Sequence, residues 1–139
     1  MAEGEENEVE ELRFLQQLYE ENYKELSEII SNSISTSNMM SANIEALSKI
    51  DEIKSNTLLL NLGAGTYVEV KMAGNGKIMT YVGAGYIVEK SAEDAKNFLE
   101  ENRSKTLDFI KKIDDERKQV EDALLEISYR LGAMDAKGN

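Results

Sequence analysis

The sequence has 139 residues, of which 41% are hydrophobic, and its 27 acidic and 16 basic side chains give a formal net charge of −11 at pH 7. This length suits one ordinary domain, and the acidic balance disfavours nucleic acids and anionic membrane surfaces as partners. Cysteine and histidine are absent, which excludes disulfides, thiolate nucleophiles and imidazole bases.

No apolar stretch approaches the roughly 20 residues that a membrane-spanning helix needs, and no basic region followed by an apolar run opens the chain. We therefore expect a cytoplasmic protein. Six of the first eleven residues are acidic and none is basic. We predict that residues 1–7 form a solvated, disordered tail.

Residues 8–54 are predicted to form one long helix. Steps of three and four trace the heptad seam of a coiled coil. Seven of the eight residues from Ser31 to Asn38 are Ser, Thr or Asn, which compete with helix by bonding the backbone. We favour a thinly packed but continuous helix there over a break. The predicted seam is Leu12, Leu15, Tyr19, Asn22, Leu26, Ile29, Ser33, Thr36, Met40, Asn43, Leu47 and Ile50.

The segment 57–90 is predicted to form two β-hairpins, because apolar residues alternate along four short stretches bounded by glycines. Gly74-Asn75-Gly76 suits a tight connection between the second and third strands. The sequence GAGTYVEV at 63–70 recurs as GAGYIVEK at 83–90, so we expect each Gly-Ala-Gly to form a strand-to-strand corner with positive φ. Neither copy continues into Gly-Lys-Ser/Thr or directly into a helix, which argues against a nucleotide-binding loop.

A second long helix is predicted at 92–134, followed by a short tail at 135–139. Ser91 is a good N-cap, and Asp94 occupies the capping-box position three residues later. The predicted seam is Leu99, Arg103, Thr106, Ile110, Ile113, Arg117, Val120, Leu124, Ile127, Leu131 and Met134.

The fold class is therefore mostly α with a small β insert: two helices of similar length form an antiparallel coiled-coil hairpin. The alternative is that each helix pairs with another chain. Four short strands are marginal alone and leave unpaired edges, so the insert should be an assembly domain. Acidic runs such as Asp114-Asp115-Glu116 are typical of a solvated helix face. We expect no catalytic residue, metal or cofactor.

The order of a heptad helix, LGAGTYVEVKM, VGAGYIVEK and a second heptad helix resembles the α-type subunit of prefoldin, in a compact form similar to archaeal members. The resemblance implies a chaperone that binds unfolded proteins without ATP and transfers them to a group II chaperonin. It also implies a heterohexamer of two α-type and four β-type subunits, joined by these strands into a double barrel. A structural scaffold of the same shape without this holding activity is the alternative.

Two sets of residues are candidates for these roles. We assign assembly to the hairpins, through Leu58, Leu60, Leu62, Gly63, Gly65, Val68, Val70, Ile78, Val82, Gly83, Gly85 and Val88. The free helix ends are where fraying leaves apolar side chains without partners. We expect client binding there, through Val9, Leu12, Phe14, Leu15, Leu18, Ile127, Tyr129, Leu131 and Met134. Phe14, Leu18 and Tyr129 lie off the predicted seams, so we expect them to be more exposed. The acidic N-terminus is an additional candidate for contacting a basic chaperonin patch or for opposing self-association.

Overall fold

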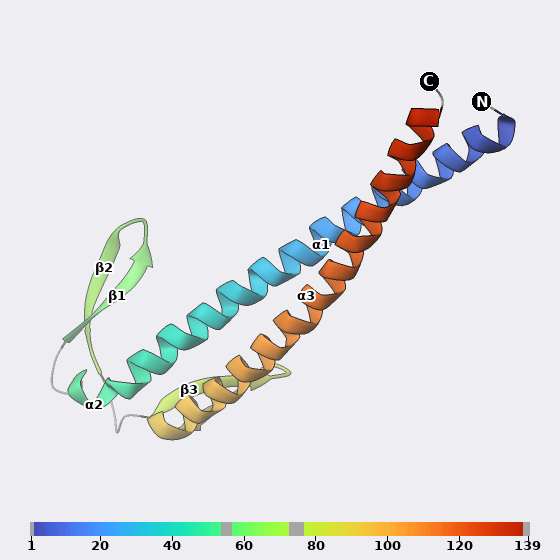
Figure 1. Cartoon of the computed structure of the whole chain (residues 1–139). Helices are drawn as coiled ribbons and strands as arrows, with labels where there is room; N and C mark the ends of the chain where they lie inside the picture. The colour runs from blue at the N-terminus through green and yellow to red at the C-terminus, as the bar shows by residue number, and fades with distance from the viewer. Residues whose placement is uncertain (1, 54–56, 73–76, 138–139) are drawn as a thin grey trace. The chain divides into compact units, whose positions relative to one another are not determined.

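A computed structural model describes residues 2–53, 57–72 and 77–137 (Figure 1). Along the chain, two long helices flank two separate two-stranded antiparallel sheets, as the sequence predicts. The predicted connection Gly74-Asn75-Gly76 lies outside the described residues. The elements are α1 (Glu3–Ser48), α2 (Ile50–Ile53), β1 (Thr57–Gly63), β2 (Thr66–Lys71), β3 (Ile78–Gly83), β4 (Tyr86–Lys90) and α3 (Ala92–Lys137).

Helix α1 begins earlier than expected. The predicted disordered tail at 1–7 is helical from Glu3 onward, and the carbonyl of Ala2 accepts hydrogen bonds from the backbone N–H groups of Glu5 and Glu6 at 2.9 and 3.3 Å. Acidic side chains in the first turn favour helix because they face the positive end of its dipole. The charge that suggested disorder therefore stabilises this helix end.

The polar segment from Ser31 to Asn38 does not interrupt α1. Ser33 is half-buried and Ser37 is only 4% exposed, whereas Ile34 remains exposed. The buried face of this segment therefore uses small hydroxyl side chains in place of large apolar ones.

Helix α1 ends at Ser48, before the predicted limit of residue 54. The hydroxyl of Ser48 donates to the carbonyl of Ile44 at 2.8 Å, and the N–H of Lys49 bonds the carbonyl of Ala46 at 3.1 Å. Serine side chains that bond the preceding turn bend helices, and a bond three residues back tightens the last turn. The turn at Lys49 separates α1 from the short helix α2.

Only every second residue of the seam predicted for α1 is buried or half-buried in the structure. At the positions between them, the buried residue is the next one along the chain. The predicted members Leu12, Tyr19, Leu26, Ser33, Met40 and Leu47 are buried or half-buried. Between them, the buried positions fall one residue later than predicted, at Gln16, Tyr23, Ile30, Ser37 and Ile44. Their predicted counterparts Leu15, Asn22, Ile29, Thr36 and Asn43 are exposed.

Helix α3 starts where the sequence predicts. The N–H of Asp94 donates to the hydroxyl of Ser91 at 3.0 Å, which confirms the N-cap. Ten of its eleven predicted seam positions are buried or half-buried, the exception being Arg103, whose neighbour Asn102 is half-buried instead. The helix continues to Lys137, beyond the predicted end at residue 134. None of the described helices is long and apolar enough to cross a membrane.

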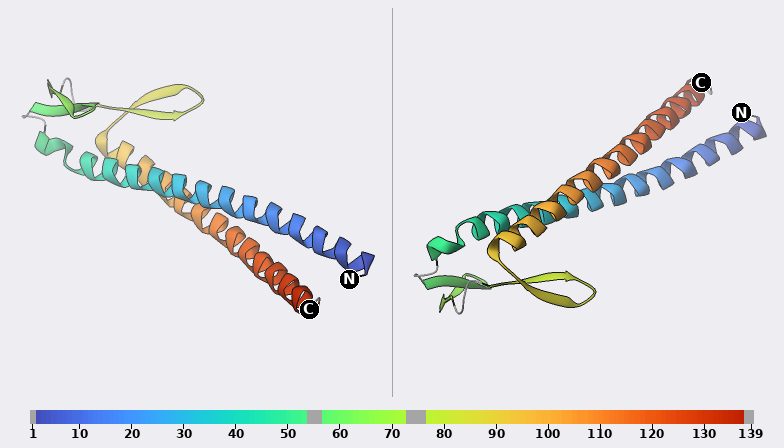
Figure 2. Two further views of the ribbon diagram at one scale, coloured as in Figure 1. Left: turned by 90° about the horizontal axis from the view of Figure 1, so that it is seen from above. Right: turned by 90° about the horizontal axis from the view of Figure 1, so that it is seen from below.

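The chain divides into two compact units, Met1–Ser35 with Leu107–Asn139, and Thr36–Thr106. In the first unit, α1 and α3 pack through a core of Leu26, Ile30, Ile113 and Val120. The first turns of α1 and the last turns of α3 lie at the same end of this unit in every view (Figures 1 and 2). The helices of this unit are therefore antiparallel.

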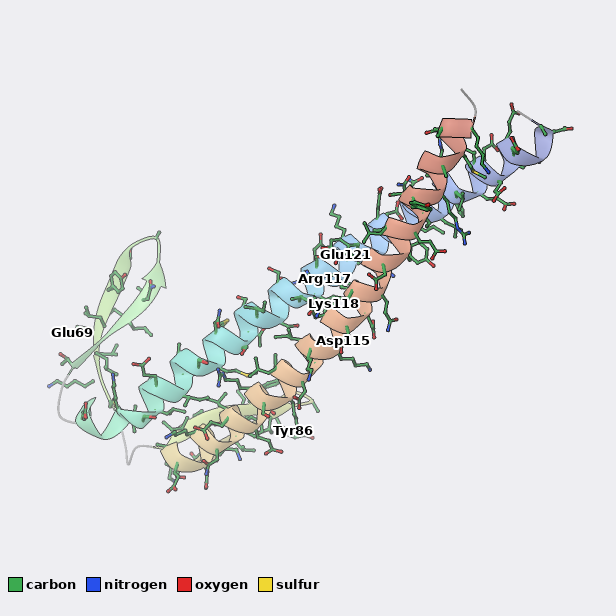
Figure 3. All side chains as sticks on the ribbon, in the orientation of Figure 1. Glu69, Tyr86, Asp115, Arg117, Lys118 and Glu121 are labelled. Atoms are coloured by element: carbon green, nitrogen blue, oxygen red, sulfur yellow. The ribbon has the colours of Figure 1, made fainter. Side chains whose placement is uncertain are left out.

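Arg117 places a charge within the seam of the first unit (Figure 3). Its guanidinium donates to Ser27 Oγ on α1 at 3.3 Å, lies 5.7 Å from the ring centroid of Tyr23, and pairs with Asp114 at 2.9 Å. Hydrogen bonds from Lys118 and Arg117 lower the pKa of the Asp114 carboxyl. A polar residue at a seam position favours one register of the helices.

In the second unit, β3 lies against the helices. Side chains from β3, the end of α1 and the start of α3 line a groove of about 540 Å³. The Lys90 ammonium lies 5.1 Å from the centroid of the Phe98 ring, which adds a cation–π contact between β4 and α3. The residues lining the groove are Met40, Asn43, Ala46, Leu47, Ile78, Met79, Thr80, Tyr81, Ala95, Phe98, Leu99 and Asn102.

Candidate functional site

The two hairpins are structural copies of each other, as their repeated sequence implies. Leu58 pairs with Val70 and Leu60 with Val68 in the first hairpin. Ile78 pairs with Lys90 and Thr80 with Val88 in the second, so every partner is shifted by the same twenty residues. Even the side-chain contacts correspond: Thr57 bonds Glu69 at 2.9 Å, and Lys77 pairs with Glu89 at 3.2 Å.

Each Gly-Ala-Gly forms the predicted corner with positive φ. Gly63 and Gly83 have φ of 95° and 107°, and Ala64 and Ala84 have φ of 51° and 53°. A β-carbon on either glycine would meet no atom within 4 Å. Backbone conformation, rather than lack of space, therefore accounts for glycine at these positions. The strand register also shifts just before each corner, between Asn61 and Gly63 and between Tyr81 and Gly83.

The assembly candidates predicted from the sequence lie mainly on one face of each hairpin. Side chains directly opposite in an antiparallel pair share a face, so Leu58, Leu60, Val68 and Val70 form one apolar face of the first hairpin. Leu60 and Val68 are exposed, whereas Leu58 and Val70 are half-buried. In the second hairpin Ile78 and Gly83 are half-buried. The remaining candidates, Leu62, Gly63, Gly65, Val82, Gly85 and Val88, are exposed.

The opposite face of each hairpin is also rich in exposed apolar side chains, which the sequence analysis did not select. Leu59 is 70% exposed on the first hairpin, and Tyr81 and its partner Ile87 are 62% and 60% exposed on the second. The unbroken run from Leu58 to Leu60 was the available signal, because a strand that is apolar on both faces does not alternate. The other members of this set are Tyr67 and Met79; Tyr86 is also exposed but shares the face of Val88, two residues later on β4.

The client-binding candidates separate into two classes by exposure. Leu12 and Ile127 are buried between the helices, and Val9, Leu131 and Met134 are half-buried. Phe14, Leu15, Leu18 and Tyr129 are exposed. Leu15 was predicted on the seam, and the phase of α1 moves it outward. Only the exposed class is free to contact another molecule without separating the helices.

Leu125 joins this exposed class, although the sequence analysis did not select it. It is 64% exposed and lies four residues before Tyr129 on α3. Residues four apart are neighbours on one helix face. That spacing was the signal that could have found it.

The acidic side chains of the described residues do not gather into a metal-binding group. No group of three or more Asp or Glu side chains within residues 2–53, 57–72 and 77–137 could hold a metal ion. Asp114 is instead paired with Arg117 and Lys118 at 2.9 and 3.3 Å. The notable features of the molecule are therefore exposed apolar surfaces.

Comparison with known proteins identifies the family. The family described as "Prefoldin subunit" matches residues 10–133, almost the whole chain. The chain belongs to the prefoldin family. Prefoldins are chaperones and not a known enzyme family, so this is a chaperone-type prefoldin subunit.

Curated relatives of this prefoldin chain carry the name "Prefoldin subunit alpha". The relative from Methanoculleus marisnigri is 29% identical over 84% of this chain and 81% of its own. The relative from Nitrosopumilus maritimus is 28% identical over 93% and 92%, and that from Pyrococcus horikoshii is 32% identical over 68% and 58%. These names support the α-type resemblance inferred from the paired hairpins.

The solved structures include a similar chain in a filamentous prefoldin from Methanocaldococcus jannaschii. Its TM-score is 0.61 at 21% identity, over 90% of this prefoldin chain and 98% of the other. This match shows a shared fold: two long helices with two small hairpins between them.

Proposed function

We propose that this chain is an α-type subunit of a cytoplasmic prefoldin that holds non-native proteins without ATP and transfers them to a group II chaperonin. One observation carries the proposal. At the free ends of α1 and α3, Phe14 and Tyr129 are 62% and 79% exposed although both are large and aromatic. Exposed apolar side chains of this size typically mark binding surfaces. In a chaperone family, the natural occupant is apolar sequence that a folded protein would bury.

The proposed client surface is narrower than the sequence suggested. It consists of Phe14, Leu15 and Leu18 on α1 and Leu125 and Tyr129 on α3, with Val9, Leu131 and Met134 at its half-buried margin. Leu12 and Ile127 serve the helix interface. Several weak contacts on separate subunits would combine by avidity.

Assembly is proposed to occur through the hairpins, in a heterohexamer of two α-type and four β-type subunits. Isolated two-stranded sheets are marginal in water, and their edges are free to pair with other strands. The exposed apolar faces of both hairpins, including Leu60, Tyr81 and Ile87, would be buried against neighbouring subunits. The similar chain in a filamentous prefoldin supports assembly as a property of this fold.

The test uses the chain co-expressed with a β-type subunit. A chemically denatured, aggregation-prone protein is diluted into the complex without nucleotide, and light scattering is followed. We expect suppression of aggregation by the parent complex. Replacing Phe14, Leu18 and Tyr129 with serine should weaken client binding about a hundredfold or more, because each of the three truncations removes about 1–2 kcal/mol of apolar contact.

The matched control replaces Met39 and Phe109 with serine, since both are exposed apolar residues away from the helix ends. Native mass measurement should give the same complex for parent, variant and control. Loss of suppression in the variant alone supports the holding function. Equal suppression by all three would contradict the proposed client surface, and no suppression even by the parent complex would favour a purely structural scaffold.

A further inference from the structure

Helix α1 carries a narrow apolar ridge on the side away from α3. Phe14 lies two residues after the buried Leu12 and two before the half-buried Gln16, so at 100° per residue it points away from the seam. Leu18 lies four residues further along on the same face, and Leu15 lies about 100° around the helix from Phe14, at the flank nearer the seam. Both are exposed. We call Phe14, Leu15 and Leu18 the α1 ridge.

Helix α3 carries a second ridge, Leu125 and Tyr129, at the same level along the coiled coil. Arg117 contacts Ser27 and the ring of Tyr23, which sets the register. Because the helices are antiparallel, a step forward along α3 matches a step back along α1. Tyr129 and Leu125 thus lie level with Phe14 and Leu18, and each ridge points away from the other helix.

Exposed acidic side chains lie beside the apolar residues of the α1 ridge. Glu10 and Glu11 precede Phe14 by one helical turn, and Glu21 follows Leu18 by three residues. All three are exposed, and within the ranges that the structure covers none of them forms an ion pair. Beside the α3 ridge, Glu126 pairs with Arg130 at 2.9 Å, while the exposed Glu121 and Asp122 precede Leu125 by one helical turn. The α1 ridge is therefore apolar with a mainly acidic border, to which the exposed Arg13 adds one positive charge.

Resting on the client-binding function proposed above, we propose that the α1 ridge selects apolar segments of non-native chains flanked by lysine or arginine. Apolar side chains of such a segment would cover Phe14, Leu15 and Leu18, while its cations would approach Glu10, Glu11 and Glu21. Segments flanked by acidic residues would meet like charge. Charge complementarity at a partly exposed rim alters affinity modestly but discriminates between partners.

The same border disfavours other occupants. A second copy of this chain would bring its own Glu10, Glu11 and Glu21 against the first set, and like charges in close contact are unfavourable. Anionic lipid headgroups and nucleic acid would meet the same repulsion. A cationic apolar segment is the partner whose chemistry matches both the ridge and its border.

The experiment compares two fluorescent peptides with one apolar core of leucine and phenylalanine, flanked on both sides by lysine or by glutamate. Binding to the assembled complex is measured by anisotropy in low and high salt. The lysine-flanked peptide should bind about three- to tenfold more tightly in low salt, as expected for a few exposed ion pairs. Screening in high salt should remove most of this preference.

A triple variant, Glu10→Gln, Glu11→Gln and Glu21→Gln, should lose the preference while still binding both peptides. The matched control, Glu100→Gln, Asp108→Asn and Asp115→Asn, changes the net charge equally on α3, away from the ridge, and should keep it. A further variant, Phe14→Ser with Leu18→Ser, should weaken the binding of both peptides.

The possible outcomes distinguish failure of charge selection from failure of client binding itself. If both peptides bind the parent complex equally, and the serine variant weakens both, the client surface stands and charge selection is overturned. Charge selection is also overturned if the control triple loses the preference as fully as the ridge triple, or if complexes associate through the ridge in place of peptide. Failure of both peptides to bind the parent complex would overturn the client surface itself.

Discussion

At the scale of single residues, the hairpin corners concentrate unusual backbone conformation in three consecutive positions. Gly63, Ala64 and Gly65 all have positive φ, and the second corner repeats this at Gly83, Ala84 and Gly85. An alanine in the left-handed region costs roughly 1 kcal/mol because its β-carbon crowds the following carbonyl. Each corner therefore contains one residue that is poorly suited to its conformation.

We predict that Ala64→Asn stabilises the first hairpin by about 0.5 kcal/mol, because asparagine tolerates the left-handed region and favours two-residue hairpin turns. Gly63→Ala should destabilise it by about 1 kcal/mol or more, since an L-residue rarely adopts a φ of 95°. The measurement is thermal unfolding of the assembled complex.

The second corner supplies an internal control for this prediction. Ala84→Asn and Gly83→Ala should have effects of the same sign, because the two corners share their φ values within about 12°. No atom lies within 4 Å of a β-carbon built on either glycine. A neutral effect of both glycine substitutions would contradict the assignment of their role to backbone conformation.

At the scale of helices and strands, the two adjacent isoleucines of α1 distinguish the observed seam from the one predicted by sequence. Ile30 is 7% exposed and belongs to the core with Ile113 and Val120, whereas Ile29 is 40% exposed. Either could serve as a seam residue when the sequence is considered alone. Only its placement against α3 decides between them.

We predict that Ile30→Ala destabilises the helix pair by about 2–4 kcal/mol, because it opens a cavity in the core. Ile29→Ala should cost less than about 1 kcal/mol, since that side chain keeps much of its surface in water and alanine favours helix. Both variants are compared by circular dichroism during denaturant unfolding of the same complex. Equal losses of stability would contradict the observed phase.

The different success of the two seam predictions has a physical cause. In α3, Ile113, Val120 and Ile127 are each flanked by polar residues on both sides, so one phase dominates and ten of the eleven predicted positions are buried or half-buried. In α1, Leu15 and Ile29 are apolar on the outer face, while Gln16 and Ser37 face inward. Exposed apolar side chains such as Leu15 and Ile29 therefore weaken the sequence pattern that locates the core.

Strand positions and the glycine corners were predictable because alternation, turn residues and an exact repeat are local signals. The second apolar face of each hairpin was not predicted, because alternating apolar and polar residues indicate a strand with one face in solvent. Leu59, Tyr67 and Ile87 depart from that assumption. Residues of a surface that other chains would cover are as apolar as core residues. In a single chain, however, they are exposed.

At the scale of the whole molecule, the two units carry different exposed surfaces. The unit Thr36–Thr106 contains both hairpins, and the unit formed by residues up to Ser35 and from Leu107 contains the terminal ridges. Substitutions in the hairpin unit should therefore alter assembly, and substitutions in the unit with the terminal ridges should alter client binding. The duplication within the hairpin unit adds a further consequence for assembly.

Because the hairpins are equivalent in register, each should join one neighbouring subunit. We predict that Tyr81→Ser with Ile87→Ser disables the second hairpin and yields smaller complexes, and that Leu59→Ser with Tyr67→Ser does the same for the first. All four substitutions together should leave a chain that no longer assembles with other prefoldin subunits. Removing several large apolar groups from an interface typically costs several kcal/mol.

Native mass spectrometry of the co-expressed subunits measures this directly, with circular dichroism to verify that the helices persist. The control replaces Met39 and Phe109, exposed apolar residues on the helices, and should leave the complex intact. If disabling one hairpin abolishes assembly as completely as disabling both, the hairpins act as one cooperative surface. If each pair of substitutions instead reduces the size of the complex only in part, the two hairpins form separate subunit interfaces. This is the outcome that their matched registers favour.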